Sequence, residues 1–149
     1  MPQAQRTAEV VWNGDLMSGS GTLTLASSGV LRDSAVTWAS RAEAPDGRTS
    51  PEELLAGAHA ACYAMALSAT LARAGSPPER LHVTAVASFD RRPEGGFRVS
   101  AMDLTVRGRV PGIDQARFEE LARQGEQGCP ISNAIRNNVA IRLTAQLEL

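Results

Sequence analysis

The 149-residue sequence predicts an α+β fold whose sheets are mostly antiparallel. Short segments of alternating apolar and polar residues occur in two groups, one in each half of the chain. A long apolar segment of helical character, residues 50–75, lies between the groups. Strands that follow one another in groups favour antiparallel pairing. We therefore expect one domain, 1–149, with N-terminal strands and a loop in 1–49, a central helix, and strands with two helices in 80–149.

Residues 1–49 are expected to form an antiparallel meander followed by a loop. Apolar residues alternate loosely over 5–12 and clearly over 21–25, and residues 35–39 could add a short third strand. The turn residues Asn13-Gly14-Asp15 separate the first two segments. A polar stretch at 41–50 then leads to the helix.

The central helix begins with a clear start signal. Ser50 is a typical N-cap residue, Pro51 suits the first helical position, and Glu53 would complete a capping box with Ser50. The local sequence gives Glu52 no role beyond a first-turn acid that favours the helix dipole. Residues 54–72 contain no charged side chain and are long enough to cross a bilayer, but the segment is rich in alanine. We expect a buried central helix instead.

The second half of the chain is expected to contain two strands, two helices and a last strand. Glycine and proline mark most of the boundaries between these elements. The elements are expected at 81–89, at 97–110, from 114 to about 125, directly after Pro130, and at 139–147.

Composition excludes several kinds of function. All 15 basic residues are arginine, so no lysine can form a Schiff base, anchor pyridoxal phosphate or serve a phosphate-binding loop. A net charge of −1 and 4% aromatic residues argue against nucleic acid or an anionic membrane as a partner. The first twelve residues lack the profile of a secretory signal, so we expect a cytoplasmic protein.

Cys62 and Cys129 are the candidate reactive groups, and their spacing matches no zinc motif. Cys62 lies in the apolar helix, where a free cysteine is usually a small buried hydrophobic residue. Cys129 lies at the expected start of a helix, where the helix N-terminus lowers the pKa of a thiol, so local context favours Cys129 as the more reactive one. His59, three residues before Cys62, leaves open a Cys–His nucleophile pair.

Two motifs resemble the OsmC/Ohr family, small thiol peroxidases of bacteria. They are SPEELLAGAHAAC at 50–62, which is similar to the family signature around its first cysteine, and GCPIS at 128–132, which is similar to its second-cysteine site. WNGD at 12–15 and VPGID at 110–114 resemble the osmotically inducible OsmC branch. The resemblance covers nearly the whole chain. It implies the family's fold, with antiparallel sheets wrapped around long central helices in an intertwined homodimer.

The resemblance also implies a cysteine-based peroxidase of antioxidant defence. The thiolate of Cys62 would attack an organic hydroperoxide, with hydrogen peroxide as a poorer substrate, releasing an alcohol and leaving a sulfenic acid. Cys129 would then form a redox-active disulfide with Cys62, which an external dithiol, typically lipoyl-linked in the family, reopens. No metal, haem or flavin cofactor is implied. The resemblance reverses the local preference for Cys129 as the first nucleophile.

The family uses an Arg–Glu pair to hold the thiolate and polarise the peroxide. By resemblance the glutamate falls on Glu52 and the arginine of the OsmC branch on Arg41, with Arg48 as a nearby competitor. The organic-hydroperoxide-resistance branch takes its arginine from an early loop, and no arginine lies between positions 6 and 32 here. A guanidinium suits this role because its charge cannot be titrated away and its planar fork can bind a carboxylate and a sulfur together.

Helix geometry predicts that such a site is shared between two chains. Ten residues of α-helix rise about 15 Å, so Glu52 cannot reach Cys62 of its own chain. If both belong to one site, Glu52 comes from a second copy of the helix running antiparallel, in a two-fold homodimer. A helix that meets its own sheet on one face and a partner on another would also be apolar nearly all round.

Two other functions remain open beside the peroxidase. One is a redox-inert binding or structural dimer of the same fold, and the other is a Cys–His acyl-transfer enzyme that uses His59 and Cys62. The presence of Cys129 favours the peroxidase, because neither alternative requires a second cysteine.

Overall fold

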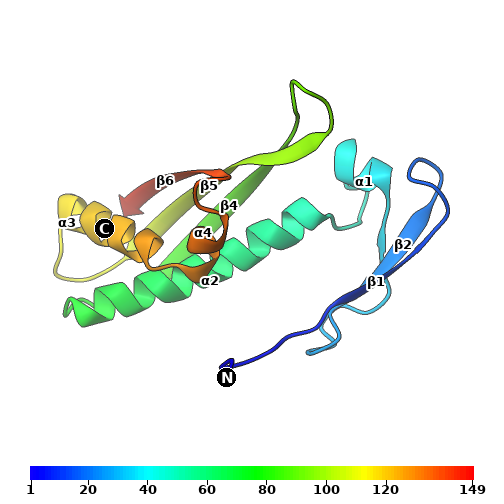
Figure 1. Cartoon of the computed structure of the whole chain (residues 1–149). Coiled ribbons are helices and arrows are strands. Elements are labelled where there is room, and N and C mark those ends of the chain that lie inside the picture. The colour runs from blue at the N-terminus through cyan, green and yellow to red at the C-terminus, as the bar shows by residue number, and fades with distance from the viewer. The chain divides into compact units, whose positions relative to one another are not determined.

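The computed structural model describes all 149 residues and divides into two compact units (Figure 1). Unit 1 comprises Met1–Leu54 and unit 2 comprises Leu55–Leu149. The long helix α2 (Pro51–Arg73) begins in unit 1 and continues through unit 2. The structure is a mixture of α-helix and two three-stranded sheets, so the predicted α+β class is confirmed.

Unit 1 contains the predicted meander. Its strands are β1 (Glu9–Asn13), β2 (Ser20–Thr24) and β3 (Ser34–Val36). They form an antiparallel sheet in that order. Trp12 faces Gly21 across the first pair, and a Cβ at position 21 would lie 2.8 Å from the indole ring. Glycine is therefore required here for the ring to lie across β2.

The third strand is shorter than expected because a helix begins directly after it. Helix α1 (Trp38–Ala42) occupies the end of the predicted strand and the start of the predicted loop. Thr37 is its N-cap: the Thr37 hydroxyl accepts a hydrogen bond from the Ser40 backbone N–H, and the Ser40 hydroxyl accepts one from the Thr37 N–H. This reciprocal pair is a capping box, which starts a helix too short to show a periodic pattern.

Helix α2 begins at Pro51, as predicted, but its cap differs in one detail. The Glu53 backbone N–H donates to the Ser50 hydroxyl at 3.1 Å, which is half of the expected capping box. The Glu53 carboxylate instead accepts a hydrogen bond from the Thr49 hydroxyl at 2.8 Å. Thr49, one residue before the cap, thus takes the place of the Ser50 N–H.

Unit 2 is built on a sheet of three strands with two further helices. The elements after α2 are β4 (Arg80–Arg91), β5 (Phe97–Arg109), α3 (Gln115–Gln127), α4 (Pro130–Ile135) and β6 (Ala140–Leu147). Strands β4 and β5 form an antiparallel hairpin, and β6 lies parallel to β5 at the edge. Each element predicted in residues 80–149 is present, and three of the four strand pairings in the chain are antiparallel.

The core of unit 2 lies between α2 and the sheet. Tyr63, Leu67 and Leu71 recur every four residues on α2 and are fully buried. They belong to one cluster with buried side chains of β5 and α3. Gly125 of α3 lies against Leu67, because a Cβ there would come within 3.0 Å of the Leu67 Cα.

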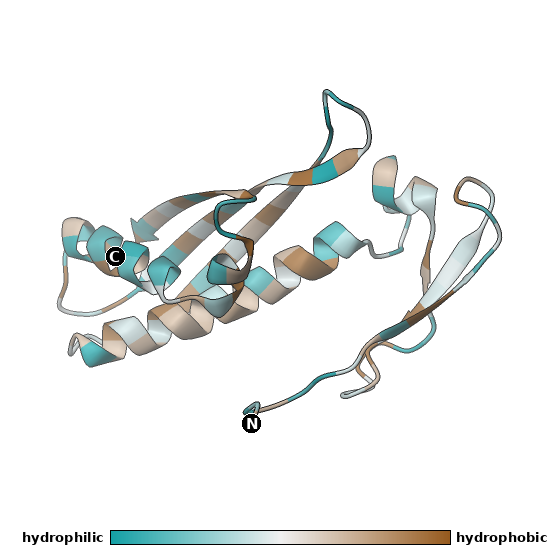
Figure 2. Ribbon diagram, viewed as in Figure 1, coloured by the Kyte–Doolittle hydropathy of each residue, from teal (hydrophilic) through white to brown (hydrophobic).

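The remaining faces of α2 are also apolar over much of its length (Figure 2). By length and composition α2 could cross a membrane, although only 28% of its most apolar window is buried within the chain. The buried stripe is part of the core of unit 2, as expected for a central helix. The unburied part of α2 presents small apolar side chains, at Gly57, Ala58, Ala61 and Ala69, together with Met65.

Candidate active site

Arg41 and Glu52 form a forked ion pair in unit 1. The Arg41 Nη2 lies 2.8 Å from Glu52 Oε1, and the Arg41 Nε lies 3.1 and 3.2 Å from the two carboxylate oxygens. Helix α1 supplies the arginine and the first turn of α2 supplies the glutamate. Glu52 is only 8% exposed, so it is not the solvated first-turn acid that its local sequence suggests. A pair held by two nitrogens in this way fixes the orientation of the Arg41 guanidinium and keeps its positive charge in one place.

Arg48, the other candidate arginine, lies elsewhere. Its guanidinium is 3.3 Å from Asp46, and both side chains are largely exposed. An exposed pair of this kind contributes little to structure. The structure therefore pairs Glu52 with Arg41.

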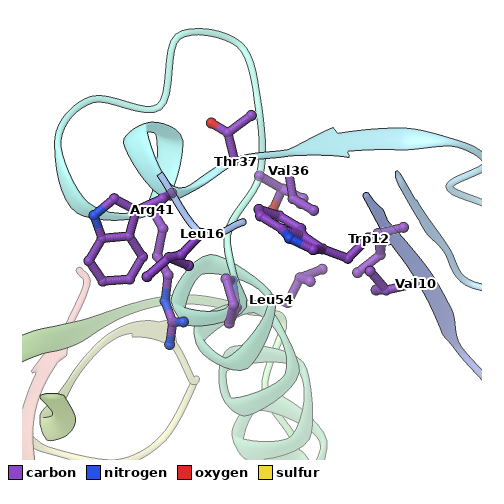
Figure 3. Close-up of a pocket in the computed structure, with 11 residues that line it drawn as sticks. Val10, Trp12, Leu16, Val36, Thr37, Arg41 and Leu54 are labelled. Atoms are coloured by element: carbon purple, nitrogen blue, oxygen red, sulfur yellow. The ribbon is translucent and has the colours of Figure 1, made fainter. Parts of the chain in front are cut away.

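The Arg41 side chain lines an apolar pocket of about 490 Å³ (Figure 3). Strands β1 to β3, α1 and the start of α2 all contribute to the wall. Figure 3 shows Arg41 reaching from α1 past Leu16 toward the start of α2. Arg41 is the only charged residue in the lining, and most of the others are apolar. A pocket of this size and composition suits a small apolar molecule with one polar group.

Cys62 and Cys129, far apart in the sequence, meet in unit 2. Cys62 projects from α2 and is half-buried, whereas Cys129 is fully buried as the N-cap of α4. Both are free thiols. The Cys129 sulfur accepts a hydrogen bond from the Ser132 backbone N–H at 3.5 Å, and Cys129 lies near enough to Cys62 to raise the pKa of its thiol. The two thiols therefore lie close together in unit 2.

Within unit 2 the surroundings of Cys62 favour the neutral thiol. Burial raises its pKa above the ordinary value, and the hydrogen bond and charge of Cys129 raise it further. A hydrogen bond from the Ile131 backbone N–H opposes this and lowers the pKa. No cation is among these influences. A thiolate at Cys62 is therefore favoured only where positive charge is brought beside it.

A groove of about 640 Å³ runs beside Cys62 along the unburied face of α2. Its floor consists mainly of alanines of α2, with Met65, and its other wall comes from the end of α3 and the start of α4. Ile131 is part of that second wall. Cys62 is thus reachable from the outside of the chain, whereas Cys129 lies behind it.

His59 does not pair with Cys62. Its Nε2 lies 2.7 Å from the Ser132 hydroxyl, and its Nδ1 is buried without a hydrogen-bond partner. Burial lowers the pKa of His59, and the nearby charges of Glu126 and Arg136 act in opposite directions on it. The ring is therefore directed at α4 rather than at the thiol, and this arrangement does not favour a Cys–His nucleophile pair.

Two groups beside the cysteines were not recognised from the sequence. These are the Ile131 backbone N–H and the Ser132 hydroxyl, both in the first turn of α4. The GCPIS motif contains both residues, but only the packing of α4 on α2 shows what they contact. The structure contains no cluster of three or more His, Cys, Asp or Glu side chains that could hold a metal ion.

Comparison with known proteins places these features in context. The family model described as OsmC-like protein matches residues 44–144. Peroxiredoxin OsmC of Escherichia coli (strain K12) is 37% identical over 130 residues, which cover 87% of this chain and 89% of that protein. The organic hydroperoxide resistance protein of Xanthomonas axonopodis pv. citri is 34% identical over 101 residues, or 64% of this chain and 66% of that protein. The crystal structure of the organic hydroperoxide resistance protein OhrB of Bacillus subtilis, 27% identical, superposes with a TM-score of 0.72 and covers 94% of this chain and 98% of that one.

Proposed function

The chain belongs to the OsmC-like protein family, and from this premise we propose that it is a cysteine-based peroxidase that reduces organic hydroperoxides. The observation that carries the proposal is that the thiols of Cys62 and Cys129, 67 positions apart in the sequence, lie close together in unit 2. A half-buried thiol backed by a second, fully buried thiol suits a two-step redox cycle. The names of the relatives, a peroxiredoxin and a hydroperoxide resistance protein, support a peroxidase role in the family.

The proposed cycle has three steps. The Cys62 thiolate attacks the terminal oxygen of the hydroperoxide, the O–O bond breaks, and the alcohol leaves after taking up a proton. The sulfur of Cys129 then attacks that of the Cys62 sulfenic acid, which forms the disulfide and releases water. An external dithiol reduces the disulfide by exchange and becomes a disulfide itself. We propose a lipoyl-type dithiol and a cytoplasmic setting, in keeping with the resemblance.

The thiolate in the first step requires a cation, and we propose that Arg41 of a second chain provides it. Glu52 holds Arg41, yet Glu52 precedes Cys62 by ten residues on one continuous helix, or about 15 Å. An antiparallel partner helix would bring the partner's Arg41–Glu52 pair to Cys62. The guanidinium would then stabilise the thiolate and polarise the peroxide, while Glu52 fixes its orientation.

The unburied apolar surface supports a dimer. In unit 1 Leu23 is the only buried large apolar residue, and Val10, Val11, Leu16 and Met17 are all more than half exposed. A three-stranded sheet without a covered apolar face is marginally stable. Apolar surface also remains open on α2, where Met65 is 70% exposed. Apolar surface of this extent is typical of a protein interface.

The apolar pocket at Arg41 supports an alkyl or aryl hydroperoxide as substrate. Trp12, Leu16 and Leu54 line it together with the guanidinium. The organic part of the substrate would occupy the apolar wall, and the peroxide group would lie against Arg41. Hydrogen peroxide would lack the first contact and is expected to be a poorer substrate.

The proposal is tested by hydroperoxide consumption. Wild type, Cys62→Ser and Cys129→Ser are mixed with cumene hydroperoxide and dithiothreitol, and the remaining hydroperoxide is measured. Cys62→Ser should be inactive. Cys129→Ser should consume peroxide in the first turnover but then over-oxidise or stop turning over. Consumption of peroxide by Cys62→Ser at the wild-type rate would contradict the proposal. So would a wild type that consumes peroxide no faster than the same mixture without protein, and this result would point to a redox-inert dimer.

A further inference from the structure

A buried polar link lies directly behind the two cysteines. The Nε2 of His59 on α2 and the hydroxyl of Ser132 on α4 are 2.7 Å apart. Both side chains have no exposed surface. The proposed cycle uses neither group, although a polar pair in a closed interior needs a reason to be there.

The helix that carries Ser132 also carries the second cysteine. Helix α4 has only six residues, and Cys129 is its N-cap. A helix of this length is marginal on its own, so contacts with the rest of the protein decide where it lies. At its far end Arg136 donates a hydrogen bond to Glu126 at 2.8 Å. At its first turn two links reach α2: the Ile131 backbone N–H bonds the Cys62 sulfur, and the Ser132 side chain bonds His59.

We propose that His59 and Ser132 are positioning residues for disulfide formation, because their hydrogen bond fixes the first turn of α4 on α2 and so aims Cys129 at Cys62. His59 lies one helical turn before Cys62, and Ser132 lies one turn after Cys129. The hydrogen bond therefore joins the same two turns that the proposed disulfide would join. The inference rests on the proposed function and concerns its second step.

The chemistry of this step makes position decisive. The Cys129 sulfur attacks the Cys62 sulfur, the S–O bond breaks, and hydroxide leaves as water with the proton given up by Cys129. The new bond is about 2.05 Å long and tolerates little error in the approach of the two Cβ atoms. A misplacement of about 1 Å in a reacting group can cost about 100-fold in rate. Attack of peroxide on Cys62 depends on α4 only through the Ile131 backbone N–H, whose hydrogen bond lowers the pKa of Cys62, so it is less sensitive to the exact position of the helix.

The test compares Ser132→Ala with Tyr63→Phe as a matched control. Tyr63 also lies on α2, is fully buried, and donates a hydrogen bond at 2.9 Å to the carbonyl oxygen of Ala122, but it ties α2 to α3 rather than to α4. Each full-length variant receives one equivalent of cumene hydroperoxide in a quenched-flow instrument. Mass spectrometry then follows the sulfenic acid, trapped with dimedone, and the disulfide over time.

We expect Ser132→Ala to form the disulfide about 10-fold to 100-fold more slowly than wild type, and its sulfenic acid at a rate much closer to that of wild type. Tyr63→Phe should form both at close to wild-type rates, even if it is equally destabilised in thermal unfolding. His59→Leu should behave like Ser132→Ala. His59→Gln, which keeps an amide nitrogen the same number of bonds from the backbone, should recover most of the rate. Disulfide formation in Ser132→Ala at the wild-type rate, or equal slowing in Tyr63→Phe, would overturn the inference.

A second readout separates this inference from the proposed function. The equilibrium between the dithiol and disulfide forms is measured in mixtures of reduced and oxidised glutathione, which requires no peroxide. The equilibrium constant for disulfide formation should be about 10-fold smaller in Ser132→Ala than in Tyr63→Phe, because the loss of the positioning bond lowers the effective concentration of one thiol at the other. If wild type failed to react with hydroperoxide, the proposed function would fall while this comparison still decided the role of Ser132 and His59. Equal equilibria in the two variants would contradict it.

Discussion

Gly57 offers a direct test of the proposed antiparallel pairing of two chains. Residue 57 is midway between Glu52 and Cys62, so an antiparallel pairing that places Glu52 opposite Cys62 places the two copies of Gly57 opposite each other. Within one chain nothing explains a glycine here: its backbone is not left-handed, and a Cβ would meet no atom within 4 Å. A glycine inside a helix costs about 1 kcal/mol relative to alanine. Close approach of a partner helix would account for it.

The substitution Gly57→Leu should leave the single chain intact and weaken the proposed dimer. Because the space around position 57 is open in one chain, leucine should gain about 0.7 kcal/mol in helix propensity. At a helix crossing the added side chain overpacks the contact, at about 1–3 kcal/mol for each copy. Two copies face each other, so the dimer should lose about 2–6 kcal/mol, a rise of about 30-fold to 20,000-fold in its dissociation constant.

Sedimentation equilibrium over a dilution series measures this effect. Ala72→Leu is the matched control, because Ala72 is exposed near the end of the same helix and lies beyond the stretch that a partner in this register covers. In addition, Gly57→Cys should form an intermolecular disulfide when Cys62 and Cys129 are both replaced by serine. A Gly57→Leu dimer as tight as wild type, together with no cross-link at position 57, would refute the proposed register.

Three further outcomes are expected. Replacement of Arg41 by methionine should lower kcat/KM for cumene hydroperoxide by about 100-fold, as for loss of a charge-stabilising donor, and a loss of less than threefold would speak against its role. Burial lowers the pKa of His59 below its ordinary 6.5, so as the pH falls the unfolded chain binds a proton at this site before the folded chain does. The free energy of unfolding should therefore decrease as the pH drops below 6.5, and urea unfolding of His59→Gln should show a shallower pH dependence. Gly125→Ala should lower the free energy of unfolding by about 1 kcal/mol in urea, because the new Cβ would lie 3.0 Å from the Leu67 Cα and this crowding outweighs the gain in helix propensity. Equal or greater stability would show that α3 can move away from α2 at little cost.

Much of the fold follows from local patterns in the sequence. The alternation over residues 21–25 and the apolar segment after Pro51 match β2 and α2 closely. Helix α1 is missed because five residues are too few to show a helical period, and its capping box between Thr37 and Ser40 is its main local signal. The parallel direction of β6 is not readable either, because alternation gives the faces of a strand but not its direction.

The residues of the candidate site can be predicted from the sequence, but several of their contacts cannot. The motifs nominate four residues, and the structure pairs Arg41 with Glu52 in unit 1 and places Cys62 close to Cys129 in unit 2. Local context favours Cys129 as the reactive thiol because it caps α4. In the fold the Ile131 N–H of that same helix reaches Cys62. Contacts of this kind depend on how α4 packs on α2, and no local pattern encodes them.

Subunit complementation tests the central claim most directly, namely that Cys62 of one chain works with Arg41 of another. Cys62→Ser and Arg41→Met should each be inactive or nearly so alone. The two are unfolded together, refolded as an equal mixture, and checked for mixed dimers by native mass spectrometry. Hydroperoxide consumption is then measured.

In a mixed dimer one site combines the intact Cys62 of one chain with the intact Arg41 of the other. Random pairing makes about half of the dimers mixed, each with one complete site, so the mixture should recover about a quarter of the wild-type activity per chain. If Arg41 instead acted on Cys62 of its own chain, no mixed dimer would contain a complete site. Mixed dimers without recovered activity would therefore contradict the account.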